Sequence, residues 1–220
     1  MRAALVTGAA GGIGSAIASR LEAGGWSVHP VDVEDGDLTT REGNRAVVEG
    51  ALERFGRLDA VVANAGLQHV SPVADFPEDE WDRLLSVLLT SPFLLAKYAW
   101  RALVESGDGR FVALASVHGL VASPEKAAYV SAKHGLLGLV KTLALEGADH
   151  GILATAVCPA FVRTPLAVAQ AGEDVLVAPH AVKRLIEPDE VAGVVEFLLG
   201  PGGRAFTGVP VTMDLGWTAR

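Results

Sequence analysis

Three polar residues in the middle of the chain have the types and the spacing needed to move a proton. Tyr129 and Lys133 stand four residues apart, and Ser116 lies thirteen residues before Tyr129, at the end of a strand-like run. Four residues is just over one helical turn, so a helix here directs both side chains the same way. A free phenol has a pKa of about 10, an ammonium one turn away favours the phenolate, and a serine hydroxyl can bond the oxygen that the phenol serves. Together the three residues predict acid/base chemistry on an alcohol or a carbonyl near neutral pH.

The tyrosine and lysine alone would also suit an ordinary helix with a surface lysine and a half-buried tyrosine. A second feature near the N-terminus favours the chemical interpretation. The glycine-rich run TGAAGGIG, from Thr7 to Gly14, lies between a predicted strand and a predicted helix. Glycines at that place permit a tight turn and let backbone N–H groups approach a pyrophosphate at a helix N-terminus. A glycine cluster alone is a weak signal, but its position here predicts a dinucleotide site.

An acidic residue beyond the glycine turn favours NAD over NADP. Asp32 follows Gly14 by eighteen residues and ends the second predicted strand. A carboxylate there can accept hydrogen bonds from the adenosine ribose and would repel a 2′-phosphate. The glycine turn itself has no Lys or Arg to hold such a phosphate. The alternative is that Asp32 is a turn residue of the acidic stretch Asp32–Asp37.

The elements that must position these residues alternate between short apolar strands and longer amphipathic helices. This order predicts an α/β fold, a doubly wound parallel sheet covered by helices on both faces, in a single domain over residues 1–220. The predicted strands are Ala3–Val6, Ser27–Asp32, Leu58–Ala63, Arg110–Ala115, Ile152–Val157 and Val209–Asp214. The predicted helices are Ile13–Ala23, a helix from the capping box Thr39–Glu42 to about Phe55, Glu78–Glu105, Ala127–Ala148 and Pro188–Leu199. Pro30 suggests an edge strand or a distortion of the strand, and the third helix must tolerate Pro92.

Composition narrows the class of protein. The 220 residues are 50% hydrophobic with a net charge of −8 and no basic run, which argues against nucleic acid and anionic membrane as partners. The apolar runs are too short to span a bilayer, and the N-terminus leads straight into a strand, so we expect neither membrane segment nor signal peptide. The single cysteine, Cys158, fits a reducing cytoplasm and is expected in the core. No metal site is predicted.

These motifs together resemble the short-chain dehydrogenase/reductase family. The resemblance rests on the glycine turn, the Asn64-Ala65-Gly66 run after a strand, Ser116, and Tyr129 with Lys133, and it covers nearly the whole chain. It implies a Rossmann-type fold, with Tyr129 as the acid/base, Ser116 as the partner of the substrate oxygen, and Lys133 holding the nicotinamide ribose and lowering the pKa of Tyr129. The residues that it implies at the cofactor are Thr7, Gly8, Gly12, Ile13, Gly14, Asp32, Asp37, Asn64, Ala65, Gly66, Tyr129, Lys133, Pro159, Val162 and Thr164.

A narrower likeness is to the D-3-hydroxybutyrate dehydrogenases of that family. It rests on the segments around Asn64–Val70 and Ser116–Lys126 and on the ending from Gly216. The likeness implies a clamp for a substrate carboxylate, with Ser116 and Tyr129 at the reacting oxygen. Its members here would be Gln68, His118, Lys126 and Gln170, with Trp217 as a wall of the pocket. Taken singly, each of these is also compatible with an ordinary polar residue in a loop.

The chain departs from the family pattern in three places. Leu88 stands where the family carries an Asn that holds a water of the proton relay. The stretch between Asp32 and Leu58 has room for one helix only, so we predict that the usual third strand and its preceding helix are missing or vestigial. Ala160-Phe161 stands where the family favours Gly and the hydroxybutyrate enzymes Trp, and the segment from Thr164 to Pro188 is short for a substrate lid.

The sequence therefore predicts an NAD-dependent oxidoreductase of a small, anionic secondary alcohol and its ketone, most simply (R)-3-hydroxybutyrate and acetoacetate. One alternative is a broader carbonyl or 3-oxoacyl reductase of the same family. Another, suggested by Leu88 and the missing strand, is a dinucleotide-binding protein with little or no turnover. Apolar faces on the helices Glu78–Glu105 and Ala127–Ala148 predict a homo-oligomer, and the resemblance implies a tetramer in the cytoplasm.

Overall fold

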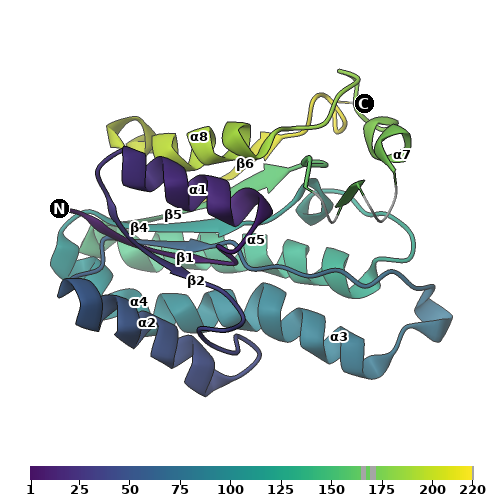
Figure 1. Cartoon of the computed structure of the whole chain (residues 1–220). Coiled ribbons are helices and arrows are strands. Elements are labelled where there is room, and N and C mark those ends of the chain that lie inside the picture. The colour runs from purple at the N-terminus through teal and green to yellow at the C-terminus, as the bar shows by residue number, and fades with distance from the viewer. Residues whose placement is uncertain (165–166, 169–171, 220) are drawn as a thin grey trace.

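A parallel sheet of six strands forms the centre of the structure, a computed structural model that describes residues 1–164, 167–168 and 172–219. The strands lie in the order β2-β1-β3-β4-β5-β6, and all neighbouring pairs run parallel (Figure 1). Their bounds are β1 (Ala3–Thr7), β2 (Ser27–Val31), β3 (Ala60–Ala63), β4 (Gly109–Leu114), β5 (Ile152–Pro159) and β6 (Pro210–Met213). The predicted α/β class and parallel sheet are confirmed.

Helices cover both faces of this sheet (Figure 1). One layer holds α1 (Gly12–Ala23) and α8 (Pro188–Leu199), and the other holds α2 (Arg41–Phe55), α4 (Ser91–Ser106) and α5 (Ala127–Gly147). The short helix α3 (Glu78–Leu85) leads through the π-helical turn η2 (Ser86–Thr90) into α4, and α7 is Glu173–Val177. Single 3₁₀ turns are η1 (Val73–Asp75), η3 (Val117–Gly119), η4 (Ala148–His150) and η5 (Pro201–Ala205).

The two hydrophobic cores follow from the period of two along each strand. Val61 and Phe111 face the layer of α2, α4 and α5, while the next residues, Val62 and Val112, face α1 and α8. All four side chains are almost wholly buried. Strands buried on both faces explain the continuous apolar runs of the sequence.

The predicted loss of one strand is confirmed. In the part of the chain that the structure describes, β2 is the last strand on its side of the sheet, and the chain passes from β2 to α2 directly. Pro30 lies on this terminal strand, as its ring requires.

Some predicted boundaries were wrong by a few residues. The N-cap of α2 is Thr40, whose hydroxyl accepts from the Gly43 N–H, so the predicted capping box with Glu42 does not form. Strand β5 runs on to Pro159, which pairs with Met213. Helix α8 begins at Pro188 as predicted, with a capping box formed by Glu187 and Glu190.

The long helix predicted from Glu78 is present but not uniform. It tolerates Pro92 because the π-helical turn just before it shifts the backbone hydrogen bonds away from the α-helical ladder. By length and composition alone, the combined stretch Glu78–Ser106 could cross a membrane, which the short apolar runs did not suggest. It packs against α2, α5, β3 and β4, however, and is a core helix of this fold.

Candidate functional site

A cleft of about 1800 Å³ opens at the carboxyl ends of the strands, where ligands bind in doubly wound sheets. That volume exceeds the usual range for a single small ligand and suits a dinucleotide together with a substrate. The cleft brings together most of the predicted site. The predicted residues that line it are Gly8, Gly12, Ile13, Gly14, Asp32, Asp37, Asn64, Ala65, Gly66, Gln68, Ser116, His118, Lys126, Tyr129, Lys133, Pro159, Val162 and Thr164.

Two glycines of the first turn are required by close backbone approach. At Gly14 a Cβ would lie 2.0 Å from the Gly8 oxygen, and at Gly8, where φ is +66°, it would lie 2.8 Å from the Ala65 Cα. The predicted residue Thr7 lies behind this turn, and its hydroxyl accepts from the Asn64 and Ala65 N–H groups at 3.1 and 3.0 Å. The Asn64 amide in turn donates to the Thr7 and Gly8 carbonyls at 2.8 and 3.1 Å. The turn is therefore held rigidly against β3.

The start of α1 fits the pyrophosphate of a dinucleotide. The N-cap residue is Gly11, so no side chain caps the first N–H groups of the helix. The first turn contains no acidic residue, and apart from its chain neighbours no described residue lies within 4 Å of where a Gly11 Cβ would be. The first N–H groups of the helix therefore face the cleft as donors for an anion. Asp32 lies beside the turn, where its Oδ2 accepts from the Ala10 N–H at 2.8 Å.

Further residues delimit the two ends of the cofactor cleft. At one end, the Asp37 Oδ1 accepts from the Thr39 N–H and hydroxyl at 2.9 and 2.7 Å, which lowers the pKa of the Asp37 carboxyl and keeps it anionic. At the other, the Thr164 side chain lies against the glycine turn, 3.1 Å from where a Gly12 Cβ would be. The cleft thus extends from the predicted adenine side to the predicted nicotinamide side.

The acid/base group of Ser116, Tyr129 and Lys133 lies between these ends. Helix α5 carries the last two, and Ser116 follows β4. The Lys133 ammonium is buried, donates to the Leu114 oxygen at 2.5 Å and lies 5.6 Å from the centre of the Tyr129 ring. The Ser116 hydroxyl lies close enough to the Tyr129 phenol to lower its pKa, and it donates to the Pro159 oxygen at 3.4 Å. The one-turn spacing therefore places the side chains together as predicted.

Burial dominates the electrostatics of this group. Burial raises the pKa of the Tyr129 phenol, against the smaller lowering by the nearby Ser116 hydroxyl, and it lowers the pKa of Lys133 to about 8. The expectation that Lys133 lowers the pKa of Tyr129 is not met in this geometry, because the lysine makes its hydrogen bond to a backbone carbonyl and is itself desolvated. Lys133 with a pKa near 8 can exchange a proton near neutral pH.

The free cysteine lies behind this group. Cys158 is fully buried, and burial raises the pKa of its thiol to about 11. It is a neutral core residue, as predicted.

An apolar cluster fills the place of the family's relay asparagine. Leu88 is 1% exposed within the π-helical turn and packs with Leu84, Ala128 and Ala132, against one side of Tyr129. Its Cδ2 lies 3.6 Å from where a Gly66 Cβ would be. The leucine side chain therefore offers no hydrogen bond to a relay water here.

Polar residues of the predicted clamp flank the acid/base group. The Lys126 ammonium lies 5.2 Å from the centre of the Phe161 ring, and burial lowers its pKa. His118 is 3% exposed, and burial, with the Lys126 and His134 charges, lowers its pKa to about 4, so it is neutral at pH 7. The Gln68 Oε1 is buried and has no hydrogen-bond partner in the described residues, which is consistent with an amide that bonds a ligand.

An aromatic wall lies behind the same end of the site. Trp217 stacks on Phe161 at 5.3 Å between centroids and meets the edge of His118 at 5.4 Å. Phe161 and His118 line the cleft, whereas Trp217, which was predicted to wall the pocket, lines a smaller neighbouring cavity instead. Gln170, the fourth predicted clamp member, lies outside the described residues.

Several residues that support this end had no local signal in the sequence. The Ser123 hydroxyl bonds His118 Nε2 at 2.8 Å, and fully buried His180 extends the aromatic wall at 6.1 Å from both Phe161 and Trp217. Ser123 lies only five residues after His118, whereas His180 comes from a distant segment of the chain, so no periodicity reveals the contacts of His180.

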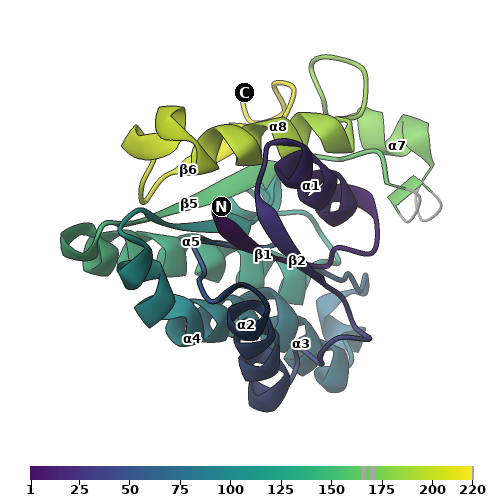
Figure 2. The ribbon, with the colours of Figure 1, turned by 60° about the vertical axis from the view of Figure 1, so that its left-hand side comes forward.

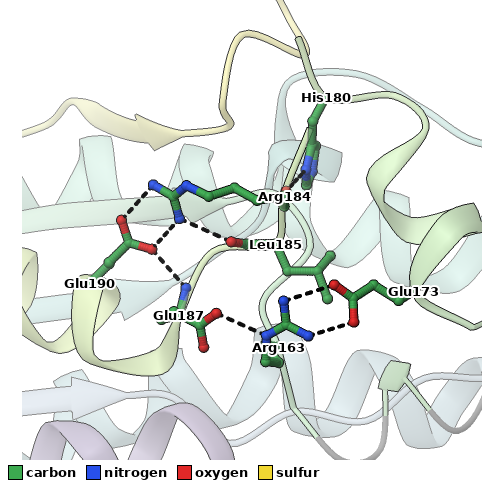
Figure 3. Close-up of polar contacts among 7 residues, drawn as sticks. All are labelled: Arg163, Glu173, His180, Arg184, Leu185, Glu187 and Glu190. Carbon is green, nitrogen blue, oxygen red and sulfur yellow. Dashed lines mark hydrogen bonds and ion pairs between the residues drawn. The ribbon is translucent and has the colours of Figure 1, made fainter. Parts of the chain in front are cut away.

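A charged network fixes the start of α7 (Figure 3). Val175 and Leu176 of this helix line the cleft. Arg163 makes a bidentate pair with Glu173 at 2.6 and 2.8 Å and a third bond to Glu187 at 2.8 Å. The first residue of α7 is thereby tied to the N-cap of α8.

Fold and site together define a nicotinamide-dinucleotide oxidoreductase. A sequence profile of the family described as Enoyl-(Acyl carrier protein) reductase matches residues 8–218. The chain is 35% identical to the D-beta-hydroxybutyrate dehydrogenases of Rhizobium meliloti (strain 1021) and of Cupriavidus necator, covering 100% of this chain and 99% and 98% of those proteins. A solved structure of a short-chain type dehydrogenase/reductase from Mycobacterium marinum superposes with a TM-score of 0.93 at 27% identity, over 100% of this chain and 96% of that one.

The chain belongs to the short-chain dehydrogenase/reductase family. Dehydrogenases of this family use nicotinamide dinucleotide cofactors, and the glycine turn, the open start of α1 and Asp32 fit such a group.

Proposed function

We propose that the protein is an NAD-dependent dehydrogenase of small 3-hydroxy acids, with (R)-3-hydroxybutyrate and acetoacetate as the leading pair. The observation that carries the proposal is the placement of Lys126, His118 and Gln68 in one cleft with Ser116 and Tyr129. One cation and a few polar groups beside the reacting oxygen are what a small carboxylate requires. The likeness to two D-beta-hydroxybutyrate dehydrogenases supports the same substrate class.

The residues divide the reaction between them. In the oxidation direction Tyr129 takes the hydroxyl proton, Ser116 holds the oxygen, and Lys126 and Gln68 hold the carboxylate. The nicotinamide, when bound, supplies the hydride acceptor. Lys133 would hold the nicotinamide ribose when the cofactor is bound, and its neutral form, which a pKa of about 8 makes accessible, takes up the proton that Tyr129 must release before it can act as a base. Asp32 favours NAD, because a 2′-phosphate beside its carboxylate would meet a like charge.

Two other functions have specific support. A broader carbonyl or 3-oxoacyl reductase is favoured by the description of the matching family profile and by exposed Val175 at the cleft. A dinucleotide-binding protein with little turnover is favoured by the apolar surroundings of Leu88. Against the latter stands the intact grouping of Ser116, Tyr129 and Lys133.

The deciding experiment mixes purified protein with NAD and (R)-3-hydroxybutyrate and follows the absorbance of the reduced cofactor. We expect reduction that Tyr129→Phe lowers by about 10²–10⁴-fold, the range of a general acid/base. Tyr98→Phe, at the other tyrosine of the chain, is the matched control and should retain activity.

A second variant separates the candidate substrates. Lys126→Ala should raise KM for the hydroxy acid and leave an uncharged alcohol unaffected. Activity on uncharged or thioester ketones with no effect of Lys126→Ala would favour the broader reductase. NAD binding without reduction by any small hydroxy acid would favour the binding protein.

We also propose that the chain acts as a cytoplasmic homo-oligomer, a tetramer by family resemblance. Exposed apolar side chains on two helices support association: Phe93 on α4 is 46% exposed, and Leu145 on α5 is 82% exposed. A single buried thiol that makes no disulfide suits the cytoplasm.

A further inference from the structure

A buried pair of polar side chains joins α2 to α4. Asn44 is 0% exposed and Ser91 is 1% exposed, and the Ser91 hydroxyl donates to the Asn44 Oδ1 at 2.6 Å. The two helices lie side by side beneath the sheet (Figure 2). A buried amide is costly unless its donors and its acceptor are all hydrogen-bonded. The groups that bond the Asn44 Nδ2 therefore identify the segment of the chain that this pair stabilises.

Those partners are in the loop before α2. The Asn44 Nδ2 donates to the Leu38 oxygen at 2.9 Å and to the Thr40 oxygen at 2.7 Å. The same loop rests directly on the first turn of α2, where a Cβ on Gly43 would lie 2.1 Å from the Asp37 oxygen. The amide therefore ties down both ends of the segment from Leu38 to Thr40.

This loop forms the far end of the cofactor cleft. Asp37, Leu38 and Thr39 line the cleft beyond Asp32, on the side away from Tyr129. With the adenosine ribose at Asp32 and the nicotinamide half at Tyr129, the part of the cleft left for the adenine ring is the part that this loop lines. In the described chain no strand lies beyond β2, so no sheet neighbour supports the loop from outside.

We propose that Asn44 is a positioning residue for the adenine half of the dinucleotide. Its amide holds the loop Asp37–Thr40 in the shape that receives adenine, and Ser91 fixes the orientation of the amide. The inference rests on the dinucleotide site of the proposed function and is independent of the alcohol that is oxidised.

Binding of ADP-ribose, which carries adenosine but no nicotinamide, tests the proposal without any turnover. Asn44→Leu keeps the branched shape of the side chain but removes both donors, and we expect ADP-ribose affinity measured by calorimetry to fall about tenfold, the equivalent of one to two hydrogen bonds. Ser91→Ala leaves the donors and frees the amide, and we expect a smaller loss of about threefold. Affinity for nicotinamide mononucleotide should change in neither variant.

Thr155→Val is the matched control. Thr155 is 4% exposed, and its hydroxyl donates to the Phe206 carbonyl, away from the cleft. It should lower the melting temperature without changing ADP-ribose affinity. The proposal is overturned if folded Asn44→Leu binds ADP-ribose within twofold of the parent, or loses both ligands equally. If Asn44→Leu does not fold, Ser91→Ala decides by the same criterion.

Because the readout is binding, failure of hydroxy-acid oxidation would leave this result intact. Conversely, full activity with unchanged ADP-ribose affinity in both variants would overturn the inference and spare the proposed function.

Discussion

Single side chains in the cleft are shifted by burial toward their neutral forms. The pKa of Lys133 falls to about 8 and that of His118 to about 4. A neutral His118 can accept a hydrogen bond at one nitrogen and donate at the other, which suits its position between Ser116 and Ser123. Lys126, Arg83 and Glu125 also line the cleft, so a substrate anion meets a lysine and an arginine cation together with the Glu125 carboxylate.

His118 makes stability depend on pH. Its folded pKa of about 4 lies below the ordinary value of 6.5. Between these values the unfolded chain binds a proton that the folded chain does not, so the free energy of unfolding falls as pH is lowered from 6.5 toward 4. We expect a contribution of about 2 kcal/mol lost between pH 7 and pH 5. This loss is measured by comparing the free energy of unfolding in urea at pH 7 and pH 5 for the parent and for His118→Gln.

His150→Gln, at an exposed histidine, is the control and should leave the pH dependence unchanged. A His118→Gln protein with the parent's slope between pH 7 and pH 5 would contradict the prediction.

Asp32 should decide the choice of dinucleotide. Asp32→Ser removes the carboxylate that would repel a 2′-phosphate, so we expect the preference for NAD over NADP, measured as the ratio of their dissociation constants, to fall at least about tenfold. Glu34→Gln removes an exposed charge two residues away and should leave the ratio within about twofold. An unchanged ratio in Asp32→Ser would place the selectivity elsewhere.

At the scale of elements, the π-helical turn η2 has the largest effect on the site. It interrupts one long helix beside Tyr129, and it directs Leu88 into an apolar cluster. Such turns are frequent at functional sites.

Leu88→Asn tests whether the relay is impaired. We expect turnover to rise several-fold, because a polar side chain beside Tyr129 can hold water for proton exchange, and we expect stability to fall by about 1–3 kcal/mol from burying an amide among leucines. Steady-state kinetics and urea unfolding measure the two effects. Leu84→Asn, in the same cluster, should lose stability without any gain in rate.

The elements themselves were largely readable from the sequence, and their details were not. The alternation of strands and helices places Asp32, Asn64, Ser116 and the glycine turn at the carboxyl ends of the parallel strands, independently of the conformation of the loops. The shift of the α2 cap from Thr39 to Thr40 could not be predicted, since both residues have a hydroxyl suited to capping. Buried His180 and the Asn44–Ser91 pair depend on contacts between distant segments, which periodicity does not encode.

At the scale of the whole molecule, two helical layers bury the sheet and leave apolar side chains outside. Phe93 and Leu145 belong to helices of the same layer. Isolated exposed apolar residues are common on protein surfaces. Phe93 and Leu145 are therefore evidence of an interface only if copies of the chain associate through this layer.

Analytical ultracentrifugation measures that association. We expect the mass of a tetramer for the parent, and a smaller species for Leu145→Glu, because a charge buried at an apolar interface is strongly unfavourable. Val73→Glu, at a 78% exposed residue in the turn η1, should keep the parent mass. A monomeric parent would contradict the prediction, as would a Leu145→Glu protein of unchanged mass.

The terminal position of β2 also bears on aggregation. A terminal strand offers unpaired backbone groups on which another chain can build a sheet. The Ser27 N–H faces β1, so by alternation the backbone positions of Val28 and Pro30 face outward. Proline has no N–H to donate, so an incoming strand would find one of its hydrogen bonds missing at the middle of this edge. The proline at the outer edge of β2 therefore disfavours the addition of a further strand from another chain.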